Sequence, residues 1–140
     1  FISIIALLNW ALGLISFGNT ILSIELILGY LFMPLAFLMG APWSEAHVLG
    51  SLMGQKLVLT EFIAYGNLAS LGDSVSTKTA TIAAYALCGF ANFASIGIQL
   101  GGIGSIAPER KKDLAKLVMK AMIGGALASW LTATIAGILL

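Results

Sequence analysis

The chain has 140 residues, of which 59% are hydrophobic and 9% are charged, and its formal net charge is +1. Ordinary soluble domains carry about 25% charged residues, so this composition excludes a soluble globular domain and indicates a membrane protein. The apolar runs recur between short polar breaks. This pattern predicts several membrane segments packed together rather than one water-excluding core.

The N-terminal sequence is apolar from Phe1 onward and has no positively charged region, so it does not resemble a signal peptide. We therefore expect the chain to be the C-terminal piece of a longer protein. The lone Cys88 allows no disulfide within the chain.

Residues 1–42 are predicted to form the end of a scaffold helix, up to about Ile15, followed by a connecting helix. Pro34 lies inside the second apolar run. Because proline removes a backbone donor and clashes with the preceding turn, this connecting helix is expected to be bent.

Residues 43–70 are predicted to form a re-entrant hairpin. Their apolar stretches, 46–49 and 57–63, are too short to cross a bilayer and flank a more polar segment. An arm of about ten residues reaches roughly 15 Å, half of a hydrocarbon core about 30 Å thick. The tip of the hairpin is therefore expected near the midplane.

Residues 71–140 are predicted to form the last two transmembrane helices, 79–104 and 113–140. The connection between them gathers five of the seven basic residues: Arg110, Lys111, Lys112, Lys116 and Lys120. By the positive-inside rule this loop is cytoplasmic, so the polar loop 71–78 lies outside and the hairpin enters from outside. The loop lacks the interleaved aromatic side chains of a nucleic-acid surface, and no nucleic-acid partner is expected.

Polar-capable side chains recur at helical spacing through the predicted span 79–104. On one continuous helix they would share a face: Thr81, Tyr85, Cys88, Asn92, Ser95 and Gln99. Such a stripe either joins helices by hydrogen bonds or lines a cavity, and both alternatives are open.

Glu61 places a carboxylate in the predicted hairpin, near the midplane of the membrane. Such a group must pair, protonate or face water. One hypothesis is a structural ion pair with Lys56. The other is that Glu61 accepts hydrogen bonds from vicinal hydroxyls of a neutral polar solute, with Asn92 as donor and acceptor. Hydrogen bonds to charged groups contribute about 1.5–3 kcal/mol each, enough to set specificity.

Two motifs, Gly54–Tyr65 and Ala86–Ile98, resemble the C-terminal half of the concentrative nucleoside transporter family, and the resemblance covers essentially the whole chain. It implies that Glu61, Asn92 and Ser95 hold the ribose, with Phe90 beside the solute. Thr60 departs from the family, which usually has Asn there, while the neighbouring carboxylate of Glu61 is in place.

The resemblance implies an all-α polytopic membrane protein, with spanning helices and a re-entrant helical hairpin as the second of two inverted repeats. It also implies symport of nucleosides such as uridine across the cell membrane by alternating access, coupled to Na⁺ or H⁺, in a homotrimer. The chain itself is expected to bind no metal or cofactor, and the coupling ion belongs to the full protein.

Two other functions are alternatives to transport. The first is a non-transporting gate or interaction domain, in which Glu61 is paired with Lys56. The second is an intramembrane enzyme, which the sequence does not support: His47 is the single histidine, and no nucleophile is accompanied by a base.

Overall fold

The computed structural model describes residues 2–14, 16–17 and 20–140. Apart from one antiparallel pair of two-residue strands, its elements are helices, which confirms the all-α prediction. In chain order they are α1 (Ile2–Gly13), β1 (Ser16–Phe17), β2 (Thr20–Ile21), α2 (Ile24–Leu38), α3 (Trp43–Val58), α4 (Glu61–Leu71), the 3₁₀ turn η1 (Gly72–Ser74), α5 (Thr77–Leu87), α6 (Phe93–Ile106), the 3₁₀ turn η2 (Pro108–Arg110) and α7 (Lys111–Leu139).

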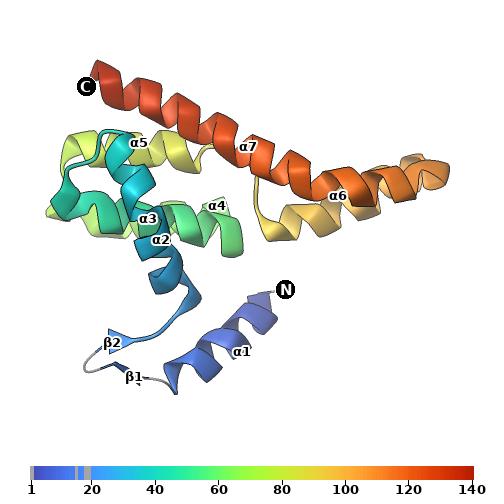
Figure 1. Ribbon diagram of the computed structural model, residues 1–140, viewed down its shortest axis with the longest axis horizontal. Coiled ribbons are helices and arrows are strands. Elements are labelled where there is room, and N and C mark those ends of the chain that lie inside the picture. The colour runs from blue at the N-terminus through green and yellow to red at the C-terminus, as the bar shows by residue number, and fades with distance from the viewer. Residues whose placement is uncertain (1, 15, 18–19) are drawn as a thin grey trace.

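The 29-residue helix α7 is the longest of the described elements (Figure 1). Helices α5 and α6 follow one another along it, and α2 lies along α3. Helix α1 joins the rest through Asn9, whose Nδ2 donates to Glu25 at 3.0 Å and whose Oδ1 accepts from the backbone N–H of Ile24 at 2.9 Å. Asn9 thus ties α1 to the first turn of α2.

The main core lies between α2, α3, α5 and α7. Its fully buried side chains include Leu49, Met53, Ile82 and Ala133. The helices approach closely because small residues lie at the crossings. At Gly50, the α3 backbone lies so near α2 that an added Cβ would be 2.5 Å from the carbonyl oxygen of Gly29.

The predicted continuous span 79–104 is wrong. Helix α5 ends at Leu87, α6 begins at Phe93, and the residues between them are not helical. Two local features cause the break. Gly89 has φ +150°, a conformation that side-chain-bearing residues rarely adopt, and Asn92 starts a new helix with a capping box.

The break also changes how the chain relates to a membrane. Within the described ranges, one helical stretch, Pro108–Leu139, is long and apolar enough to cross a bilayer by itself. The 11 residues of α5 and the 14 residues of α6 are each shorter than a span. Discontinuous helices of this kind are characteristic of transporters.

Helices α3 and α4 form a hairpin whose turn is Leu59–Thr60. Between the arms, Asn67 Nδ2 donates to Gln55 Oε1 at 2.6 Å. At the open end, the Glu45 carboxylate accepts from the Ser76 hydroxyl at 2.8 Å, which ties the start of α3 to the start of α5. The hairpin is therefore held at its mouth and between its arms, and its turn is directed away from the polar loop 71–78.

The close crossing of α2 and α3 yields a stability prediction. Gly50→Ala should destabilise the protein by about 1–3 kcal/mol, because the new methyl group collides with backbone rather than with a movable side chain. Gly66→Ala is the matched control, since nothing lies within 4 Å of an added Cβ there. That change should be neutral or stabilise by about 0.5–1 kcal/mol. Thermal unfolding of the full-length protein in detergent measures both, and equal melting temperatures would contradict the packing described.

Candidate functional site

Glu61 is the first residue of α4, directly after the turn of the hairpin. Thr60 caps this helix, with its Oγ1 accepting from the backbone N–H of Ile63 at 3.3 Å. Threonine and asparagine are both good N-cap residues, so the departure at Thr60 preserves the cap. The half-buried Glu61 carboxylate lies at a helix N-terminus, where the helix dipole favours negative charge.

Asn92 begins α6 in the same way, on the other side of the second helix break. Its Oδ1 accepts from the backbone N–H of Ser95 at 2.7 Å, and the Ser95 hydroxyl donates to the Asn92 carbonyl at 2.6 Å. Both side chains are buried, with exposed fractions of 0% and 1%. The two residues form one capping unit rather than two positions on a helix face.

The two breaks meet through a direct contact. Asn92 Nδ2 donates to Glu61 Oε2 at 2.9 Å. The orientation of the amide is fixed, because the Ser95 N–H can only donate and the Glu61 carboxylate, when ionised, can only accept. The N-termini of α4 and α6 therefore converge on one carboxylate.

Phe90 lies in the non-helical segment, two residues before Asn92, and is 54% exposed. It lines a hollow of about 280 Å³ between α6 and α7 together with Ser95 and Gln99. Opposite them α7 presents Ala121 and Gly125. The hollow touches Phe90 and Ser95 but not Glu61 and Asn92, so the four predicted site residues do not all line one cavity.

The polar stripe predicted on one helix face does not exist as such. Thr81 and Tyr85 belong to α5, whereas Ser95 and Gln99 belong to α6. The regular spacing of the stripe continued across the break and hid it. The missed signal was local: a glycine at position 89 followed by an Asn92-x-x-Ser95 capping pattern.

The predicted ion pair between Lys56 and Glu61 is not formed. Lys56 is 0% exposed, and its Nζ donates to the Ala86 carbonyl at 2.9 Å and to Ser129 Oγ at 2.7 Å. In the part of the chain that the structure describes, the one ion pair is an exposed contact between Arg110 and Asp113. The structure therefore lacks the Lys56–Glu61 pair on which the hypothesis of a non-transporting gate or interaction domain depends.

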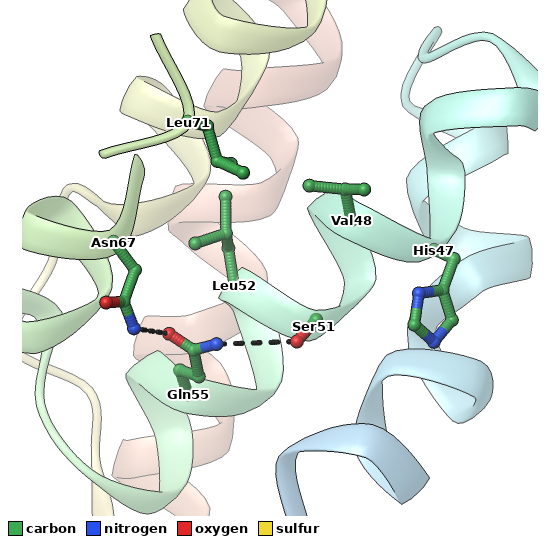
Figure 2. Close-up of a pocket in the computed structure, with 7 residues that line it drawn as sticks. All are labelled: His47, Val48, Ser51, Leu52, Gln55, Asn67 and Leu71. Carbon is green, nitrogen blue, oxygen red and sulfur yellow. Dashed lines mark hydrogen bonds between the residues drawn. The ribbon is translucent and has the colours of Figure 1, made fainter. Parts of the chain in front are cut away.

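A second cavity, of about 200 Å³, lies along the hairpin (Figure 2). Gln55 forms its floor, donating to Ser51 Oγ at 3.4 Å and accepting from Asn67 at 2.6 Å. His47 stands apart from these three and is directed toward α2. No sequence motif predicted a cavity at this position. Among the described residues, no group of three or more His, Cys, Asp or Glu side chains is placed to hold a metal ion.

Comparisons with known proteins show which family the chain resembles along its length. Residues 1–137 match the family model described as "Na+ dependent nucleoside transporter C-terminus". The chain is 52% identical over 139 residues to the "Uncharacterized transporter YutK" of Bacillus subtilis, covering 98% of this chain and 34% of that protein. It is 41% identical over 158 residues to the "Sodium/nucleoside cotransporter 1" of Mus musculus, covering 99% and 24%.

A solved structure of CNTnw in an inward-facing substrate-bound state shares 43% identity with the chain, at a TM-score of 0.88. The match covers 98% of this chain and 35% of that one. The chain thus spans about a third or less of the length of the relatives that it matches. These relatives are transporters of the cell membrane rather than enzymes. The chain belongs to the concentrative nucleoside transporter family and corresponds to the C-terminal part of that family's proteins.

Proposed function

We propose that, in the full-length protein, this chain supplies the ribose-binding half of a nucleoside site in an ion-coupled symporter. The observation that carries the proposal is the contact between Glu61 and Asn92 where two helix breaks meet. Half-helix N-termini that converge on a polar site are the usual way in which transporters bind a solute inside the membrane.

The chemistry of Glu61 suits a sugar with adjacent hydroxyls. An ionised carboxylate offers about four acceptor sites on its two oxygens, and Asn92 uses one of them. The remaining sites can accept from two vicinal hydroxyls. Ser95 belongs to the same capping unit as Asn92. The exposed ring of Phe90 offers an apolar face for the solute.

The coupling ion is Na⁺ or H⁺, and it travels with the nucleoside as a second cargo. We assign its site to the first repeat, in the part of the protein that precedes this chain. The same part supplies the first of two inverted repeats, and alternating access arises as the repeats move around the solute. The apolar side chains that α1 leaves exposed, including Ile4, Leu7 and Trp10, fit contacts with that part or within a homotrimer.

Glu61→Gln tests the ribose contacts. Gln keeps an acceptor for Asn92 but loses the charge, so uridine binding should weaken by about ten- to a hundred-fold, equivalent to about 1.5–3 kcal/mol. Competition by 2′,3′-dideoxynucleosides should change much less, because they lack the hydroxyls that Glu61 accepts from. Competition binding to the full-length protein measures both ligands. Equal losses for both would assign Glu61 a structural role.

The double role of Asn92 yields a second test. Asn92→Ala removes the cap of α6 as well as the donor to Glu61, so ligand-free stability should fall by about 0.5–2 kcal/mol. Asn92→Ser keeps a capping oxygen and loses only the amide donor. It should retain most of the ligand-free stability, yet lose the uridine-dependent rise in melting temperature. If Asn92→Ser kept the full uridine response, Asn92 would be a packing residue only.

Topology is tested by labelling. In a Cys88→Ala background, a cysteine in place of Asp73 should react with an impermeant maleimide added outside. A cysteine in place of Lys112 should react only after permeabilisation, because basic loops stay in the cytoplasm. The opposite pattern would invert the proposed orientation of the hairpin.

A further inference from the structure

Lys56 is the most deeply buried charge among the residues that the structure describes, and the proposed binding site does not use it. It lies in the last turn of α3, is fully buried, and donates to two neutral acceptors on two other elements. Burying an ammonium is costly unless its hydrogen bonds are satisfied. A lysine in this position therefore requires a physical reason.

The acceptors supply that reason. Ala86 lies in the last turn of α5, and its usual helical donor, the N–H of Phe90, belongs to the non-helical segment. The Lys56 ammonium takes the place of that donor, at 2.9 Å. It also lies where the helix dipole of α5 places partial negative charge.

Ser129 completes the arrangement from α7. Its hydroxyl donates to the carbonyl of Ala126 at 2.9 Å, which leaves the oxygen free to accept from Lys56. Gly89 covers the ammonium: a Cβ added there would lie 3.5 Å from Lys56 Nζ and 3.5 Å from Ser129 Cβ. The Lys56 nitrogen thus joins α3 of the hairpin to α5 and α7, close to the residue at which α5 ends.

We propose that the Lys56 ammonium is a built-in cation that positions the segment 88–92, and with it Phe90 and Asn92, for solute binding. The inference rests on the proposed function, because it concerns the same site. Lys56 is a positioning residue: it holds the negative end of α5 against α3 and α7, while Glu61 and Asn92 join the positive ends of α4 and α6.

The test is chemical rescue in the full-length protein with Cys88 as its one cysteine. Lys56→Ala removes three carbons and the ammonium, which n-propylammonium replaces. We expect the variant to bind uridine about tenfold more weakly, because both hydrogen bonds that hold the segment through Lys56 are lost. Cys88 is the first residue of the segment 88–92 and is exposed. Its reaction with a maleimide should become faster once Lys56 no longer holds that segment. n-Propylammonium should restore both properties. Tetramethylammonium, which has the charge but no N–H donor, should restore neither.

Lys116→Ala is the matched control, because Lys116 is an exposed lysine on α7 and should leave both properties unchanged. A purely structural lysine would lower stability without a specific response to n-propylammonium, so absence of rescue in a folded Lys56→Ala variant overturns the inference. If Lys56→Ala does not fold, the inference is tested with Ser129→Ala instead. It removes one acceptor and should speed the reaction of Cys88 and weaken uridine binding by about threefold. Unchanged values for Ser129→Ala also overturn it.

The same measurements separate this inference from the proposed function. If the unmodified protein and Lys116→Ala show no stabilisation by uridine, the proposed function fails. Cys88 reactivity needs no ligand, so it still reports whether Lys56 fixes the segment.

Discussion

The structure depends on two helix breaks that lie side by side, and on how charge is sorted between them. At these breaks α3 and α5 end while α4 and α6 begin. The partial negative charge of the ends and the partial positive charge of the beginnings need opposite partners, especially away from water. Lys56 lies at the ends and Glu61 at the beginnings, so each charge stabilises the helix termini next to it.

This sorting of charge also supports the proposed role of Glu61 in solute binding. If Lys56 were its counter-ion, the ammonium would occupy acceptor sites on the carboxylate, and a neutral sugar would have to displace a charged partner. Instead Lys56 is satisfied by Ala86 and Ser129, and the partner of Glu61 is the neutral amide of Asn92. The carboxylate therefore keeps most of its acceptor sites for a neutral solute.

Composition and the two motifs were sufficient to predict the all-α membrane fold, and the structure brings Glu61, Asn92 and Ser95 together. Two features were missed. The break after Leu87 was hidden because polar side chains keep helical spacing across it, and the backbone conformation of Gly89 is decided locally. The partners of Lys56 lie 30 and 73 residues away along the chain, whereas Glu61 is only five residues away. Five residues turn a helix by about 140° beyond a full turn, so Lys56 and Glu61 would point to different sides even without the turn at Leu59–Thr60.

The capping role of Asn92 constrains how the site can respond to a ligand. Its Oδ1 holds the first turn of α6 and its Nδ2 holds Glu61, so the amide cannot rotate toward a solute without uncapping the helix. Losing such a cap costs about 1 kcal/mol, comparable to the net gain from one neutral hydrogen bond. The free acceptor sites of the half-buried Glu61, in contrast, can accept from a hydroxyl without breaking either contact. In the proposed site, a solute with two adjacent hydroxyls would therefore meet a carboxylate that is already in place, and its binding free energy would not be spent on rebuilding the helix start.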